Sequence, residues 1–370
     1  MHQILKDITA AGTSIWLDDL SRERLITNGK SRNLKLLIEN ESVLGVTTNP
    51  AIFSAAISQS DLYSADILKY STSGLGAEAI INELTTADVS AACDLFMPVY
   101  ERTLGVDGRV SIEVDPRLAR DTEGTIQQAR ELWTRVNRNN VLIKVPATVE
   151  GIPAIRTLIS EGISVNVTII FSVERYRAVL EAFLAGLEDR LAKSLPISDI
   201  HSVASFFVSR VDNDIDPKLK NHADPAAQSL LGKAAIANAR LAYEHFLTVM
   251  NSPRWQKLSE RGAAIQRPLW ASTGVKDPAY HPTLYVMELI APNTVNTMPE
   301  PTLQAVRDSG QFKGDTVTPY FSEAARVIEE LQNFGIHIDE VATRLENEGI
   351  EKFIKPWLEL IAAVERAAKQ

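Results

Sequence analysis

The sequence is poor in the features that mark several classes of protein. Its 370 residues include one cysteine, Cys93, so a disulfide within the chain is impossible and a reducing compartment is expected. No run reaches the ~18 apolar residues that a membrane helix requires. The segment from Met1 lacks a basic stretch followed by an apolar core, so we expect no secretory signal. We therefore predict a cytoplasmic protein without a membrane span.

The net charge and the motifs that are missing argue against several further classes of function. The formal net charge is −9, which argues against nucleic acid as a partner because a phosphate backbone requires a basic surface. A small anion held by a few local cations remains compatible with this charge. The six histidines show no HExxH or similar spacing, so we expect no protein-bound metal. Neither GxGxxG nor GxxxxGK[ST] occurs.

Short apolar runs alternate along the chain with longer amphipathic stretches. Eight runs are interpreted as strands, the last two more weakly by periodicity: 14–18, 44–49, 109–114, 141–145, 163–170, 202–208, 267–272 and 293–297. Eight strands that alternate with helices favour a parallel sheet closed into a (β/α)₈ barrel. An open, doubly wound sheet is the structural competitor.

Two segments are longer than a minimal barrel unit. Residues 52–105 exceed one crossover and are expected to hold two or three helices. Residues 317–370 are predicted to form a C-terminal helical extension, which either packs over the barrel or forms a subunit contact. No Pro/Gly/Ser-rich linker divides the chain, so we predict a single domain over residues 1–370. Ser172 is the expected N-cap of the helix that follows it.

Polar residues recur on one face of five predicted strands. Alternate residues of a strand share a face, so Val141, Ile143 and Val145 lie opposite Lys144. The same alternation is predicted to put other polar residues on Lys144's face: Asp18, Thr47, Asn49, Ser111, Glu113, Ser164, Asn166 and Thr168. In the same way Val165, Val167 and Ile169 are expected to share the aliphatic face. Central parallel strands are usually apolar on both faces, so this face is predicted to line a barrel interior near its carboxyl end.

These residues suit amine chemistry. Desolvation disfavours a charged lysine, and a neutral Lys144 can attack a carbonyl to form a Schiff base. Cleavage of a neighbouring carbon–carbon bond then needs a base and an acid, for which Asp18 and Glu113 are candidates, with a water ordered by Thr168 as relay. Asn49 and Asn166 are candidates for binding substrate hydroxyls. Taken singly, each residue also has an ordinary structural explanation.

An anion site is predicted further along the chain. Ser205 and Arg210 are placed just past the sixth strand, and Ser272, Thr273, Gly274 and Lys276 just past the seventh. Loops in this region of a barrel often bind phosphate through backbone N–H groups and cations. An equally open interpretation is that Arg210 forms a salt bridge with Asp212 or Asp214.

The residues just described resemble the transaldolase family. The matching stretches are "WLDDLSR", "GVTTNPAIF", "VSIEVDPRLA", "VLIKVPATVEGI", "GISVNVTIIFS", "SFFVSRVD" and "IAPNTVNTMPEPTL", spread from about residue 14 to residue 305. The resemblance implies a (β/α)₈ barrel of class I aldolase type that moves a dihydroxyacetone unit from sedoheptulose 7-phosphate to glyceraldehyde 3-phosphate in the pentose phosphate pathway. It implies no cofactor.

The resemblance also implies a role for each candidate residue. Lys144 matches the Schiff-base lysine, and Asp18 the proton-transferring aspartate, with Asp19 as the rival assignment. Glu113 and Thr168 match the pair that holds the catalytic water. Asn49 and Asn166 match contacts to substrate hydroxyls, and Ser205 and Arg210 match phosphate-binding positions.

One departure from the family pattern concerns the loop after the seventh strand. Many members carry an arginine there in an "ASFR"-like context, whereas this chain reads "ASTGVK", so Lys276 is the candidate replacement. A lysine binds phosphate as a point charge without the bidentate fork of arginine.

The extra segments resemble the longer members of the family, and we expect a monomer or a homodimer. Two alternatives stay open. One is a lysine-dependent aldolase that releases its product, and the other is a barrel that binds sugar phosphates without catalysis.

Overall fold

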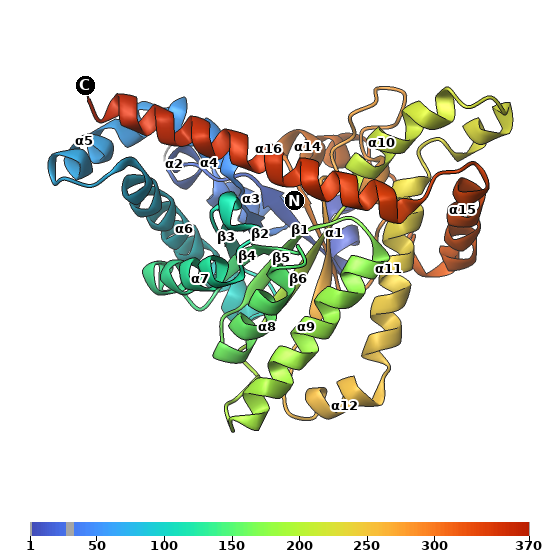
Figure 1. The fold of residues 1–370 in the computed structure, drawn as a ribbon, viewed down its shortest axis with the longest axis horizontal. Helices are drawn as coiled ribbons and strands as arrows, with labels where there is room; N and C mark the ends of the chain where they lie inside the picture. Colours follow the sequence, from blue (N-terminus) through green and yellow to red (C-terminus); the bar gives the residue numbers. More distant parts are fainter. Residues whose placement is uncertain (1, 27–32, 370) are drawn as a thin grey trace.

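The computed structural model describes residues 2–26 and 33–369, which form a closed barrel of parallel strands (Figure 1). The strands pair in chain order and β8 returns to β1. Their bounds are β1 Thr13–Asp18, β2 Val43–Thr47, β3 Arg109–Glu113, β4 Val141–Pro146, β5 Val165–Ile170, β6 Ser202–Phe207, β7 Gln266–Ala271 and β8 Thr294–Met298. The predicted barrel is confirmed, and the open sheet is excluded. Each predicted strand falls within two residues of the observed bounds.

Helices follow the strands and form the outer layer of the barrel (Figure 1). Ser172 caps α9 as predicted, because its Oγ accepts a hydrogen bond from Arg175 N–H. The α-helices are α1 Gln3–Ala10, α2 Arg22–Leu25, α3 Leu34–Asn40, α4 Pro50–Ser58, α5 Ser64–Thr72, α6 Ala77–Arg102, α7 Thr122–Val136, α8 Gly151–Glu161, α9 Val173–Ala192, α10 Ser209–Lys220, α11 Ala234–Met250, α12 Pro253–Ser259, α13 Leu284–Met287, α14 Glu300–Ser309, α15 Phe321–Asn333 and α16 Ile338–Ala367. Four short 3₁₀ turns accompany them: η1 Asp61–Tyr63, η2 Pro116–Leu118, η3 Pro225–Leu230 and η4 Thr318–Tyr320.

Large side chains fill the barrel interior below the carboxyl ends of the strands. Trp16 of β1 is fully buried, and its indole N–H donates to Asp107 at 3.0 Å. A Cβ atom added to Gly45 of β2 would lie 2.6 Å from the Trp16 ring, so only glycine fits there. Arg267 of β7 also donates to Asp107, at 2.9 Å. This packed layer supports the more open region above it.

One strand departs from the predicted alternation. The pairing of β5 with β6 shifts register between Val167 and Ile170, and Ile169 has a φ of +55°. A β-branched residue rarely adopts this left-handed conformation, which here accompanies a local bulge. A Cβ atom at Gly349 of α16 would be 3.7 Å from Ile169 Cγ2. The prediction that Ile169 shares a face with Val165 and Val167 is therefore wrong, since its side chain reaches toward α16 instead.

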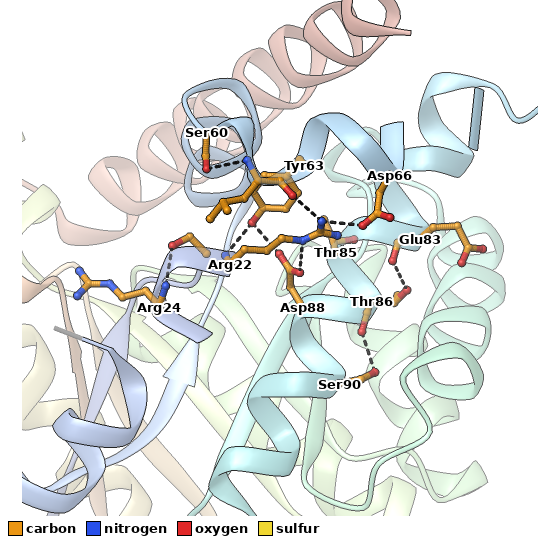
Figure 2. A network of polar contacts seen from close by, with 12 residues as sticks. Arg22, Arg24, Ser60, Tyr63, Asp66, Glu83, Thr85, Thr86, Asp88 and Ser90 are labelled. Atoms are coloured by element: carbon orange, nitrogen blue, oxygen red, sulfur yellow. Dashed lines mark hydrogen bonds and ion pairs between the residues drawn. The ribbon is translucent and has the colours of Figure 1, made fainter. Parts of the chain in front are cut away.

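The long segment after β2 forms three α-helices, α4 to α6, as predicted, and an ionic cluster joins it to α2 after β1. Figure 2 shows Arg22 between Tyr63, Asp66 and Asp88. Arg22 pairs with Asp66 at 2.7 Å and with Asp88 at 3.1 Å, and its guanidinium lies 4.4 Å from the centre of the Tyr63 ring. The Tyr63 hydroxyl donates to Asp88 at 2.7 Å. We call Arg22, Tyr63, Asp66 and Asp88 the Arg22 cluster.

The C-terminal helix α16 lies across the barrel, which is one of the two arrangements that the sequence left open. It runs as a long diagonal across the top of the barrel in Figure 1, from the α5 side to the α15 side. It contacts α4, α6 and α10 as well as β5. Helix α16 therefore packs over the carboxyl end of the barrel, whereas α15 of the same extension packs against α11. Within the described part of the chain, no helix is both long enough and apolar enough to cross a membrane.

Candidate functional site

The centre of the candidate site is a buried ion pair between neighbouring strands. Register places Glu113 of β3 beside Lys144 of β4, and Lys144 beside Asn166 of β5. Lys144 Nζ lies 3.0 Å from Glu113 Oε2, and both side chains are nearly inaccessible. Lys144 also donates to the Thr48 carbonyl at 3.1 Å. The sequence prediction that Lys144 faces Glu113 and the next strand is confirmed.

Asp18, at the end of β1, contributes a second buried carboxylate to the same region. It accepts a hydrogen bond from Thr47 Oγ1 at 2.7 Å, and Thr47 and Thr297 are themselves hydrogen-bonded at 2.6 Å. Burial raises the pKa of Asp18, although the nearby Lys144 charge and the Thr47 bond act against that shift. The rival Asp19 instead forms an ion pair with Arg24 at 2.7 Å. The geometry thus places Asp18, and not Asp19, beside Lys144.

The pKa of Glu113 is raised as well, chiefly by burial, while the charge of Lys144 works in the opposite direction. Apart from the ion pair with Lys144, neither carboxylate oxygen of Glu113 has a hydrogen-bond partner among the residues that the structure describes. The buried hydroxyl of Thr168 is likewise without a partner in that part of the chain. These polar atoms therefore remain available to a ligand or a water molecule.

A short chain of hydrogen bonds crosses the barrel interior beneath these groups. Ser205 Oγ donates to Asn166 Oδ1 at 2.7 Å, and Asn166 Nδ2 donates to Ser111 Oγ at 2.9 Å. Ser205 lies within β6 and not past its end, so that part of the prediction is wrong. Sequence placed Ser205 near Arg210, but the alternation of the strand points its side chain into the interior.

Arg210 lies in the first turn of α10, and two aromatic rings lie close to its guanidinium group. Its guanidinium carbon lies 5.2 Å from the centre of the Phe207 ring and 5.9 Å from that of Phe353. Its Nη1 atom is buried and has no hydrogen-bond partner among residues 2–26 and 33–369. Burial lowers the pKa of Arg210, with Glu348, Asp18 and Glu113 acting against the shift. A half-buried guanidinium whose buried Nη1 donor has no partner in the described chain is suited to an anion.

The alternative interpretation of Arg210 as a structural salt bridge is wrong. Asp212 accepts hydrogen bonds from Ala235 N–H at 2.8 Å and from the Tyr285 hydroxyl at 2.9 Å. Asp214 pairs with Lys218 at 2.5 Å and with Arg344 at 2.7 Å. Both carboxylates are engaged elsewhere.

Asn49 follows β2 and Lys276 follows β7, and both line the opening at the carboxyl end of the barrel. Asn49 follows β2 and is not part of it, because its Oδ1 caps α4 by accepting from Ile52 N–H at 3.1 Å. This cap leaves the amide N–H donors of Asn49 for a ligand. Lys276 is exposed in the loop after β7. That loop begins at Ser272, which has a φ of +55° and a hydroxyl 3.0 Å from that of Ser209.

A cavity of about 130 Å³ joins these groups at the carboxyl end of the barrel. Many of the residues singled out from the sequence line it: Asp18, Thr47, Asn49, Lys144, Thr168, Ser205, Arg210, Ser272, Gly274 and Lys276. Glu113 and Asn166 contact two of these residues, Lys144 and Ser205 respectively. The cavity is also lined by Phe353 of α16, which sequence reasoning did not single out. Its position in an amphipathic helix is indistinguishable by pattern from that of an ordinary core residue.

Across the residues with described positions, no group of three or more His, Cys, Asp or Glu side chains is arranged to hold a metal ion.

The fold and this site together define a class of protein: a (β/α)₈ barrel whose carboxyl end encloses a buried lysine, two carboxylates and an arginine. Comparison with known proteins gives the particular family. Residues 15–364 match the model of the family described as Transaldolase/Fructose-6-phosphate aldolase, and the chain belongs to that family.

Two relatives match this chain along its whole length. The transaldolase of Thermobifida fusca (strain YX) is 51% identical over 370 residues, which is 100% of this chain and 99% of that protein. The transaldolase of Arthrobacter sp. (strain FB24) is 54% identical over 362 residues, covering 98% and 96% of the two chains. These comparisons agree with the family that the sequence motifs indicated.

Proposed function

We propose that this protein is a transaldolase that transfers a dihydroxyacetone unit between sugar phosphates through a Schiff base on Lys144. The observation that carries the proposal is the ion pair of Lys144 with Glu113 at 3.0 Å, buried at the mouth of the barrel. Full-length relatives named transaldolase support the same activity. The substrates follow from the family: sedoheptulose 7-phosphate and glyceraldehyde 3-phosphate would give erythrose 4-phosphate and fructose 6-phosphate.

The first step requires a neutral amine. Because burial raises the pKa of Glu113, the shared proton is more readily held by that carboxyl group than by an ordinary glutamate. Lys144 Nζ then attacks the ketone carbon of the donor, and loss of water gives an iminium. We assign to Glu113 and Thr168 the water that carries protons in this step, since Glu113 Oε1 and Thr168 Oγ1 have no hydrogen-bond partner among the described residues.

The second step breaks a carbon–carbon bond. Asp18 takes the proton of the donor's C4 hydroxyl, the C3–C4 electron pair moves into the iminium, and an aldose phosphate leaves. The remaining enamine attacks the carbonyl carbon of the acceptor, and Asp18 returns the proton. Hydrolysis of the new iminium releases the product ketose and restores the amine.

Binding groups surround these reacting atoms. Arg210 and Lys276 are assigned to the substrate phosphate, with Ser205 nearby as a supporting polar group. Asn49 and Asn166 are assigned to the sugar hydroxyls. Arg210 supports this assignment most directly, because its buried Nη1 has no protein acceptor in the described chain.

The broader setting follows from the sequence. Cys93 is a free, buried thiol, which is compatible with a reducing compartment, and we propose that the protein is cytoplasmic. We further propose a single folding unit that includes residues 317–370, because α16 packs against the barrel. A monomer or homodimer is expected from the likeness to longer family members.

The test combines trapping with a coupled assay. Borohydride in the presence of fructose 6-phosphate should add covalent mass at Lys144, and Lys144→Ala should lose both trapping and turnover while keeping its far-ultraviolet circular dichroism. Consumption of fructose 6-phosphate should require erythrose 4-phosphate. Trapping at another residue would refute the assignment of Lys144. Equal turnover with and without the acceptor would identify a simple aldolase, and absence of trapping would indicate a binding protein.

A further inference from the structure

Phe353 of α16 contacts both cations of the candidate site. Its ring centre lies 5.5 Å from Lys144 Nζ and 5.9 Å from the guanidinium carbon of Arg210. The side chain is 7% exposed and lines the cavity. Lys144 and Arg210 come from β4 and α10, so one ring on a third element bridges the reactive and the anion-binding ends of the cavity.

The position of α16 fixes that ring. Gly349 and Phe353 are four residues apart and therefore lie on the same face of the helix. A Cβ atom at Gly349 would lie 3.6 Å from Arg210 Nη1 and 3.7 Å from Phe171, so the helix backbone rests directly on the barrel mouth. The opposite face is solvent-exposed, as shown by Leu358 at 49%. Phe353 thus points down from a helix that spans the opening.

We propose that Phe353 is a specificity-determining residue that directs the bound three-carbon intermediate to an acceptor aldehyde instead of to water. This inference rests on the proposed transaldolase activity. The competing reaction begins when the enamine carbon takes a proton, which gives the iminium of dihydroxyacetone. Water then adds to its C2 atom, the C–N electron pair returns to nitrogen with a proton, and free dihydroxyacetone and the Lys144 amine result.

The chemistry of a phenyl ring opposes this competing reaction in two ways. The ring offers no hydrogen-bond donor or acceptor that could orient a water molecule above C2, and it occupies space that water would otherwise fill. The ring also carries no acidic proton, and it keeps away water that could protonate the enamine carbon, which is the first step of the competing reaction. An acceptor sugar phosphate can still bind, because Nη1 of Arg210 beside the ring has no hydrogen-bond partner among the described residues.

The experiment measures two products from fructose 6-phosphate in each variant: dihydroxyacetone released without acceptor, and sedoheptulose 7-phosphate formed with erythrose 4-phosphate. We compare wild type, Phe353→Leu and Phe353→Ala. Leu358→Ala, which removes an exposed apolar side chain from the same helix, is the matched control. Borohydride trapping at Lys144 is recorded for every protein, so that each ratio refers to an enzyme that forms the Schiff base.

The ratio of release to transfer should rise about tenfold or more in Phe353→Ala, because water can then reach the enamine carbon and the iminium C2 atom that the ring had shielded. Phe353→Leu keeps an apolar cover and should show a smaller rise, which also keeps the test valid if the alanine variant does not fold. Leu358→Ala should match wild type. An unchanged ratio in variants that trap and transfer would overturn this inference alone. Absence of trapping and transfer in the wild type would overturn the proposed function and this inference with it.

Discussion

At the scale of single residues, the surroundings decide what a common side chain can do. Lysine and arginine usually lie at protein surfaces, yet here Lys144 is paired in the interior and Arg210 lies between two aromatic rings. Arginine keeps its charge even where burial lowers its pKa. Its buried Nη1 atom has no hydrogen-bond partner among the described residues, and on this ground we propose that Arg210 binds an anionic group of the substrate.

We predict that Arg210→Ala raises KM for fructose 6-phosphate by about 10- to 100-fold, the worth of one or two charge-assisted hydrogen bonds. The KM for unphosphorylated fructose should change little. Steady-state kinetics with both sugars measures this difference. Arg344→Ala removes a guanidinium that pairs with Asp214 outside the cavity and serves as the control. A proportional rise in KM for both sugars would show that Arg210 acts structurally.

At the scale of elements, the Arg22 cluster joins α2 to the helices that follow β2 (Figure 2). Asp88 on α6 is 3% exposed, and burial raises its pKa against the opposing effects of Tyr63 and Arg22. Removing Arg22 would leave that carboxylate with a single side-chain partner, the Tyr63 hydroxyl. Since α2 begins shortly after Asp18, the cluster also supports the loop that leaves β1 at the candidate site.

Arg22→Ala is therefore expected to lower the free energy of unfolding by about 2 kcal/mol, as for loss of a partner to a buried charge. Urea denaturation followed by circular dichroism checks this value. The control is Arg156→Ala, because Arg156 pairs with Asp189 at an exposed site where ion pairs contribute little. Equal destabilisation by the two variants would contradict a special role for the Arg22 cluster.

At the scale of the whole molecule, buried titratable groups make stability depend on pH. Burial raises the pKa of Asp212 from 3.8 to about 7, with the neighbouring Asp216 adding to the shift. The folded state therefore favours the protonated carboxyl group. The stability that this group contributes is fully present below about pH 4 and is lost as pH rises through about 7.

We predict that the wild-type free energy of unfolding falls between these pH values by up to about 1.4 kcal/mol per pH unit from this group. Asp212→Asn should flatten that slope, because an amide cannot ionise but can still accept from Ala235 N–H and donate to the Tyr285 oxygen. Urea unfolding at a series of pH values gives both slopes. The assignment fails if wild type and Asp212→Asn show the same dependence.

Much of the barrel was predictable because strand periodicity is local. The alternation around Lys144 predicted its inward direction, and the matching alternation in β3 predicted Glu113 beside it. The bulge at Ile169 was not predictable, since the residues around it show the regular alternation of an unbroken strand. The prediction for Ser205 was wrong because its proximity to Arg210 in the sequence suggested that both follow the sixth strand. In the structure Ser205 lies within β6, whereas Arg210 lies beyond it in α10.

The sequence by itself determined the elements, the polar face of the strands and the chemistry available on it, because these depend on residue types at short, regular spacings. Only the tertiary structure decided that Asp18 and not Asp19 lies beside Lys144, and that Arg210 has no carboxylate partner in the described chain. The same is true of the position of Phe353 on α16, whose ring contacts both Lys144 and Arg210. These contacts join residues far apart in the chain. Closure of the barrel and packing of α16 across its carboxyl end bring these residues together, and neither can be predicted from a local sequence pattern.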